Sequence, residues 1–88
     1  MEGFVYILQS QKNYSYYVGS TTDIERRLFE HSIGQTKSTK NLAPWKLVFF
    51  KSYPDIKTAR QVEYKVKKLK SKKIIERIIL DQDILMGG

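Results

Sequence analysis

The stretch VYILQSQKNYSYYVGS, residues 5–20, holds four of the six tyrosines of this 88-residue chain. Residues 4–8 (FVYIL) are apolar on both alternating faces, a pattern typical of a strand covered on two sides. The segment QSQKN is polar and turn-forming, and YSYYVG returns to residues that favour strands. The stretch therefore predicts an antiparallel hairpin, and a fold about residues 11–12 places Tyr6 opposite Tyr17 on one face.

The next segment, residues 21–34 (TTDIERRLFEHSIG), predicts a helix whose two adjacent arginines have different surroundings. At 100° per residue, Arg27 and His31 fall at the edge of the inward face defined by Ile24, whereas Arg26 points to solvent. A guanidinium directed toward the protein body needs a partner, because an unpaired buried charge is unfavourable. We therefore expect Arg27 to have a polar or charged partner inside the fold.

The rest of the chain predicts a further strand and two helices, so that the order is β-β-α-β-α-α. Residues 45–53 (WKLVFFKSY) alternate well enough for a third strand, and residues 56–70 and 71–80 are amphipathic with helical spacing. The predicted inward faces of these two helices consist of Ala59, Val62, Val66, Leu69, Ile74, Ile75, Ile78 and Ile79. The candidate caps are Thr22 with Glu25, Asp55 and Ser71, and Gly34 is a candidate stop.

Size and composition restrict the class of protein. A chain of 88 residues has room for one core, so we expect a single domain over residues 1–88. The chain has no cysteine, which excludes disulfides and thiolate metal sites. No apolar run approaches the roughly 20 residues of a membrane span, and the start of the chain lacks a signal-peptide pattern. These features predict a soluble, cytoplasmic protein.

The charge is strongly positive and uneven. The net charge is +7, and residues 57–77 contain nine basic and two acidic side chains. Phosphate polymers are the partners that such a field favours, although a solvated lysine-rich helix face is the simpler alternative. The candidate nucleic-acid contacts are Lys67 and Lys70 in this region and Lys37, Ser38, Thr39 and Lys40 in a polar loop. That loop could equally be an ordinary solvated segment.

An ordered set of motifs resembles the GIY-YIG nuclease superfamily, and in particular its small stand-alone members. The signature is spelled Val5-Tyr6-Ile7 and Tyr17-Val18-Gly19, and it is followed by Arg27, His31 and a later helical Glu63. The resemblance extends over most of the chain, from residue 4 to about residue 79. It implies a three-stranded antiparallel β-sheet flanked by helices, an α+β fold that agrees with the element order.

The resemblance also implies metal-assisted hydrolysis of phosphodiesters. By that resemblance Glu63 binds a divalent cation, Mg²⁺ or Mn²⁺, and Arg27 holds the scissile phosphate. Tyr6 or Tyr17 activates the nucleophile, and His31 assists near the phosphate. Gly19 keeps the end of the second strand clear for the approach of the backbone. A cation and an arginine on two sides of a phosphate stabilise the charge that develops there. A single carboxylate is a sparse metal site, which Mg²⁺ tolerates because it keeps several waters.

Each of these residues also has a structural interpretation. Tyr6 could be a core aromatic, Gly19 a turn residue, His31 a buried side chain, Arg27 a partner of Asp23, and Glu63 a partner of Lys67 or Arg60. We favour the site because all five structural interpretations would have to hold at once.

The leading hypothesis is a metal-dependent DNA endonuclease that acts on branched, damaged or single-stranded structures, in a role such as DNA repair. An RNA nuclease and a catalytically inactive nucleic-acid-binding module are the alternatives. A protein-interaction domain is the third, and it leaves the signature unexplained.

Overall fold

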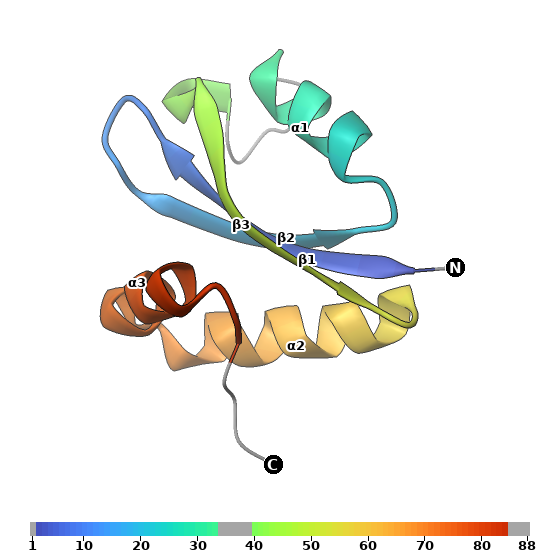
Figure 1. Cartoon of the computed structure of the whole chain (residues 1–88). Helices are drawn as coiled ribbons and strands as arrows, with labels where there is room; N and C mark the ends of the chain where they lie inside the picture. The colour runs from blue at the N-terminus through green and yellow to red at the C-terminus, as the bar shows by residue number, and fades with distance from the viewer. Residues whose placement is uncertain (1, 34–39, 85–88) are drawn as a thin grey trace.

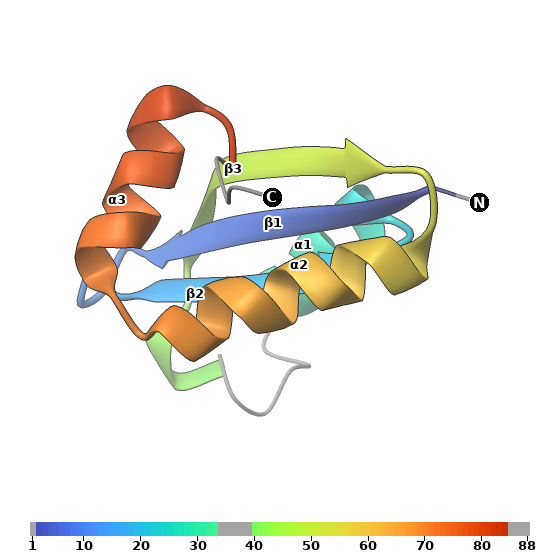
Figure 2. The same ribbon diagram turned by 90° about the horizontal axis from the view of Figure 1, so that it is seen from below.

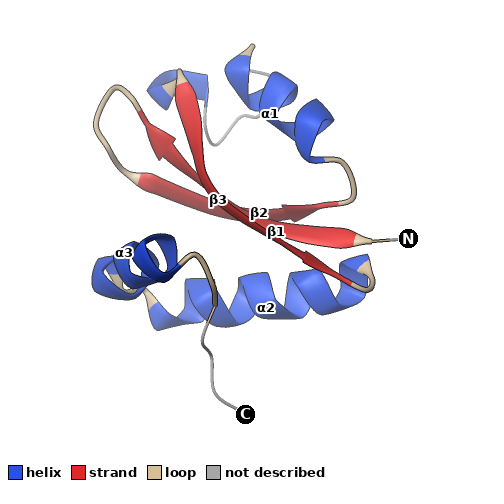
Figure 3. Cartoon of the chain, in the orientation of Figure 1, coloured by secondary structure: helices blue, strands red, loops and turns tan. Residues whose placement is uncertain are grey.

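Three strands form one antiparallel sheet in the order β2-β1-β3. The computed structural model describes residues 2–33 and 40–84. The elements are β1 (Gly3–Ser10), β2 (Tyr16–Thr21), α1 (Ile24–Ser32), the 3₁₀ turn η1 (Lys40–Leu42), β3 (Trp45–Tyr53), α2 (Ile56–Leu69) and α3 (Lys72–Asp81) (Figure 3). The predicted α+β fold and its β-β-α-β-α-α order are confirmed. Gly34, Lys37, Ser38 and Thr39 lie outside the described residues.

The sheet has helices on both faces. Figure 1 shows α1 above the sheet and α2 with α3 below it. The view from below in Figure 2 shows α2 running along β1 and β2, while α3 lies nearer β3. Within the described ranges, no helix is long and apolar enough to cross a membrane. Tyr6 lies on the face of the sheet that α1 covers.

The central strand β1 is buried on both faces, as its sequence predicts. Val5 and Ile7 are fully buried and belong to the core that α2 and α3 cover. Tyr6 and Leu8 alternate with them and are no more than 2% exposed on the opposite face. A strand between two neighbours and two helical layers has no solvated side, so a continuous apolar run suits it.

The hairpin register differs from the prediction by two residues. Gly19 pairs with Tyr6, and Tyr17 pairs with Leu8. The reason is the turn, in which the Ser10 hydroxyl accepts hydrogen bonds from two backbone N–H groups and Tyr14 adopts a positive φ of 62°. Tyr6 and Tyr17 still share a face, as diagonal neighbours whose ring centroids are 6.3 Å apart.

The helix caps confirm two of three predictions. Asp55 caps α2 and Ser71 caps α3, each by accepting a backbone hydrogen bond three residues later. The predicted capping box of Thr22 and Glu25 is wrong, because Asp23 caps α1 through the backbone N–H of Arg26 at 3.1 Å.

The buried apolar face of α2 ends earlier along the helix than the spacing of its apolar residues predicts. Ala59 and Val66 are buried and Val62 is partly buried, as predicted. Leu69 is wrong as a core residue, since it is 47% exposed. It is the last residue of α2, and the chain turns away at Lys70 in a left-handed conformation. The predicted inward isoleucines of α3 are confirmed, with Ile78 buried and Ile74, Ile75 and Ile79 packed against the core.

Two substitutions on α3 test this packing. Ile78 is 4% exposed and Leu80 is 78% exposed. We expect Ile78→Ala to lower the free energy of unfolding by about 2 to 4 kcal/mol, because it removes buried methyl groups and leaves a cavity. The matched control Leu80→Ala should change it by less than about 0.5 kcal/mol. Urea denaturation measures both, and equal losses would contradict this placement of α3.

Candidate active site

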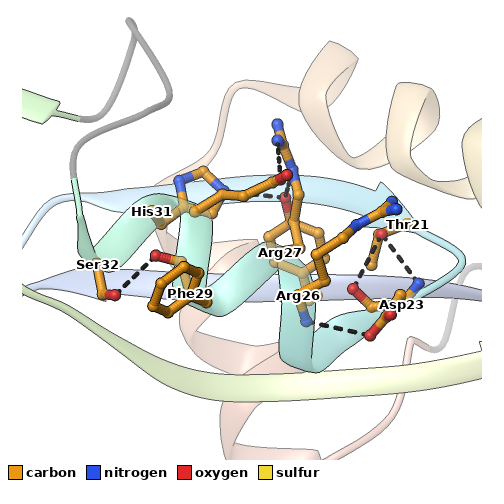
Figure 4. A network of polar contacts seen from close by, with 9 residues as sticks. Thr21, Asp23, Arg26, Arg27, Phe29, His31 and Ser32 are labelled. Carbon is orange, nitrogen blue, oxygen red and sulfur yellow. Dashed lines mark hydrogen bonds and ion pairs between the residues drawn. The ribbon is translucent and has the colours of Figure 1, made fainter.

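The hydroxyl group of Tyr6 is the meeting point of the candidate site. Arg27 Nε donates a hydrogen bond to the Tyr6 oxygen at 3.3 Å, and His31 Nε2 lies 3.2 Å from the same oxygen. Both partners come from α1, four residues apart, so that they lie on one side of the helix over the sheet (Figure 4). Arg27 is also held by Glu30, whose Oε1 lies 3.0 Å from Nη1. The predicted polar partner of Arg27 is therefore Tyr6, and its ion pair is with Glu30 rather than Asp23.

Gly19 makes room for the Tyr6 ring. A Cβ atom at Gly19 would lie 2.5 Å from the Tyr6 hydroxyl oxygen and 2.6 Å from Cζ. Gly19 faces Tyr6 directly across the β1–β2 ladder, so the phenol lies over the glycine instead of beside a side chain. The resemblance to the nuclease superfamily implies that Gly19 keeps space free at the second strand, and in this structure the Tyr6 ring occupies that space.

Burial fixes the protonation of Tyr6 and His31. Burial raises the pKa of the Tyr6 hydroxyl to about 12; the hydrogen bond from Arg27 opposes this, and the Tyr17 and Glu63 charges add to it. Burial, assisted by the nearby Arg27 charge, lowers the pKa of His31 to about 4. At neutral pH the pair is a phenol and a neutral imidazole. Because Arg27 only donates, the phenol hydrogen is available for His31 Nε2.

Tyr17 contacts Tyr6 and His31 through its ring and takes no part in the hydrogen bond between them. Its ring centroid is 5.0 Å from that of His31 and 6.3 Å from that of Trp45. Both contacts are edge-to-face, the preferred geometry for such rings. Tyr17 therefore packs against both the His31 imidazole and the Trp45 indole, where the start of β3 pairs with the end of β1.

Glu63 reaches the site from the opposite face of the sheet, at the edge formed by β2. The Ser20 hydroxyl donates a short hydrogen bond to Glu63 Oε1. The ammonium of Lys67 lies 2.6 Å from Glu63 Oε2 and also lies over the Tyr17 ring, 5.5 Å from its centroid. The pairing of Glu63 with Lys67 was one of the structural alternatives, and it is observed.

Two hollows flank this edge. One, of about 230 Å³, is lined in part by Ser20, by the carboxylate residue Glu30 and by three arginines, Arg26, Arg27 and Arg60. The other, a groove of about 490 Å³, is lined in part by Tyr14, Tyr16, Tyr17, Lys67, Lys70 and Lys72. Ser20, Arg26 and Arg60 were not among the predicted site residues. The three-residue spacing of Arg60 and Glu63 on one helix face was the signal that could have identified Arg60.

The structure brings together four predicted residues, Tyr6, Tyr17, Arg27 and His31, and places Glu63 at the adjoining edge. Lys67 and Lys70 line the groove, and Lys40 begins η1. Their roles in catalysis and in nucleic-acid binding stay predictions.

The chemistry of the donor set suits a hard divalent cation. The Glu63 carboxylate and the Ser20 hydroxyl offer oxygen ligands, the kind that Mg²⁺ and Mn²⁺ prefer. The Lys67 ammonium on Oε2 shows that this carboxylate already attracts a cation. Residues 2–33 and 40–84 contain no group of three His, Asp or Glu side chains that could hold a metal. The site therefore fits a weakly held cation that keeps most of its waters.

Comparison with known proteins finds a matching family, related sequences and a related structure. A profile of the GIY-YIG catalytic domain matches residues 2–76. UPF0213 protein BH0048 of Halalkalibacterium halodurans is 39% identical over 74 residues, which cover 83% of this chain and 78% of that protein. UPF0213 protein lwe0147 of Listeria welshimeri is 40% identical over 72 residues, or 81% of this chain and 79% of that protein. The solution NMR structure of UPF0213 protein BH0048 from Bacillus halodurans superposes with a TM-score of 0.58 at 36% identity, covering 100% of this chain and 88% of that one.

Gly19→Ala tests the contact with Tyr6. The substitution should lower the free energy of unfolding by about 1 to 3 kcal/mol, because the Tyr6 ring is held by Arg27 and His31 and has to shift. In a Tyr6→Leu background the same substitution should cost well under about 1 kcal/mol, since the phenol is absent. Thermal or urea denaturation of the four proteins gives the coupling. A cost independent of the residue at position 6 would contradict the contact.

The stability of the protein should depend on pH through His31. The unfolded chain protonates this imidazole below its ordinary pKa of 6.5, whereas its folded pKa is about 4. Between these values the unfolded state binds more protons, so the free energy of unfolding falls as the pH falls. We expect His31 to account for about 2 to 3 kcal/mol of the loss between pH 7 and pH 4.5.

His31→Gln isolates this contribution, because the carboxylates titrate alike in both proteins. Urea denaturation at the two pH values should show a smaller loss in the variant than in the unsubstituted chain. Equal losses would show that His31 is not buried as a neutral imidazole.

Proposed function

Because the chain belongs to the GIY-YIG family, whose members are nucleases, we propose that it is a divalent-metal-dependent endonuclease that hydrolyses phosphodiester bonds of DNA. We propose further that one domain over residues 1–88 carries the activity, in the cytoplasm and in a role such as DNA repair. The observation that carries the proposal is the convergence of Arg27 and His31 on the Tyr6 hydroxyl beside an arginine-lined hollow.

The scissile phosphate is proposed to bind in the hollow formed by Arg26, Arg27 and Arg60. A guanidinium has five N–H donors, and two of those of Arg27 bond to Tyr6 and Glu30. The others can bind phosphate oxygens while these bonds fix the plane of the guanidinium. The hollow holds three arginine charges and one carboxylate, Glu30, which pairs with Arg27. The net positive charge suits a group whose negative charge grows in the transition state.

Tyr6 and His31 are proposed to move the proton of the attacking water. Tyr6 accepts that proton on its oxygen while its own hydroxyl hydrogen passes to His31 Nε2 across the 3.2 Å contact. The low pKa of His31, caused by burial and then by the Arg27 charge, opposes this transfer in the resting protein. A phosphate bound to Arg27 would offset that charge and raise the pKa of His31, so substrate binding itself would prepare the relay.

Glu63, with Ser20 beside it, is proposed to hold the divalent cation. When bound, the cation supplies positive charge that stabilises the developing charge on the phosphate oxygens. Ser20 orients the carboxylate by its hydrogen bond to Oε1, and Tyr17 keeps the imidazole of His31 in place.

The polymer is proposed to be held by its phosphates, without recognition of a base sequence. Lys67, Lys70 and Lys72 line the groove next to the site, together with tyrosine rings on which bases can stack. The net charge of +7 adds a long-range attraction. DNA is the polymer proposed, and RNA is the alternative that the cleavage assay tests.

Two observations favour an inactive binding module as the second candidate. The Lys67 ammonium already neutralises Glu63, and the pKa of the Tyr6 hydroxyl is about 12 because of burial. A protein that only binds nucleic acid would retain the lysines of the groove without needing either group for chemistry.

Cleavage assays separate the two candidates. The protein would be incubated with single-stranded, duplex and branched DNA and with RNA, in Mg²⁺ or Mn²⁺. We expect metal-dependent cleavage of DNA, reduced on the order of 10²- to 10⁴-fold by Glu63→Gln or Arg27→Ala, because each removes a preorganised electrostatic group. Glu76→Gln, an exposed carboxylate on α3, is the matched control and should leave cleavage unchanged. Salt-sensitive binding without cleavage of any substrate would support the binding module instead.

A further inference from the structure

The ammonium group of Lys67 contacts both the Glu63 carboxylate and the ring of Tyr17. Its ammonium lies 2.6 Å from Glu63 Oε2, on the carboxylate oxygen that Ser20 does not use. It also lies over the ring of Tyr17, 5.5 Å from the centroid, on strand β2. The side chain thus extends from α2 to Glu63 and Tyr17 at the edge of β2, while 48% of its surface stays exposed to solvent.

We infer that Lys67 is a positioning residue that occupies the cation position on Glu63 until a divalent metal displaces it. This inference rests on the proposed function, because it concerns the carboxylate assigned to the metal. A carboxylate has two oxygens, and in this structure one accepts from Ser20 and the other is paired with Lys67. A metal that binds Glu63 must therefore compete with a tethered ammonium for Oε2.

Lys67 has two opposing effects on the binding of a metal by Glu63. While Lys67 is in place, it and the Ser20 hydroxyl hold the Glu63 carboxylate at the edge of β2, so that the carboxylate is already oriented for a cation. Its positive charge also repels an arriving divalent cation at close range, and this repulsion weakens metal binding. Once displaced, the ammonium still lines the groove with Lys70 and Lys72, where it can contact a phosphate.

Direct measurement of Mn²⁺ binding tests this role without relying on cleavage. Free Mn²⁺ would be followed by electron paramagnetic resonance during titration of the protein alone. We expect Lys67→Met to bind Mn²⁺ on the order of tenfold more tightly than the unsubstituted chain, because a nearby positive charge has been removed. Lys67→Arg keeps the charge and should leave the affinity within about twofold of the original.

Lys68→Met is the matched control for net charge. Lys68 is exposed and lies about 140° around the helix from Glu63, so its removal lowers the charge of the protein equally without freeing the carboxylate. Its effect on Mn²⁺ affinity should stay below about twofold, since its charge lies on another side of the helix from Glu63 and is screened by the solvent and salt between them. Glu63→Gln should abolish the binding in every background.

The possible outcomes separate this inference from the proposed function. If Mn²⁺ binding depends on Glu63 but Lys67→Met and Lys68→Met have equal affinities, the role of Lys67 is overturned while the metal site stands. If no variant binds Mn²⁺ in a manner that depends on Glu63, both the metal site and the role of Lys67 are overturned. Tighter binding confined to Lys67→Met, with Lys67→Arg unchanged, supports the inference.

Discussion

The buried hydroxyl group of Tyr6 is the constraint on which the candidate site depends. A polar group inside the protein is unfavourable unless it is hydrogen-bonded, and Tyr6 lies on the central strand at 2% exposure. Its bonds come from Arg27 and His31, which fixes the rotation of α1 about its axis and its height above the sheet. The ring needs space on the neighbouring strand, which fixes the residue at position 19 as glycine. One phenol therefore orients a helix and restricts an adjacent strand.

The fold could be predicted largely from local patterns. The apolar run of β1 indicated a strand covered on two sides, and the spacing on α2 and α3 indicated which faces pack on the sheet. The predictions of the hairpin register and of the α1 cap were wrong because, at each place, the hydrogen bonds of one polar side chain decide between local arrangements of similar energy. Ser10 moved the hairpin register by two residues, and Asp23 replaced Thr22 as the cap of α1. Such choices depend on hydrogen bonds that hydrophobic periodicity does not report.

The site was predictable only where the chain repeats a helical period or matches a family motif. Arg27 and His31 follow from their positions on α1, and the signature drew attention to Tyr6 and Tyr17. Ser20 was not identified, and Arg60 was considered only as a partner of Glu63, because both residues line the site at the edge of β2, where residues from opposite faces of the sheet meet. Contacts of that kind depend on how α2 lies along the sheet, which a single sequence does not specify.

The close approach of Tyr6 to Gly19 also bears on how this protein can change during evolution. A side chain at position 19 and an aromatic ring at position 6 exclude each other, because both would need the same volume beside β1. Position 19 is the constrained one: its enlargement has to accompany or follow loss of the ring at position 6, and that loss removes the hydroxyl group from the site. A lineage that acquires a side chain at position 19 has therefore lost the phenol at position 6, and it cannot regain that phenol by a single substitution.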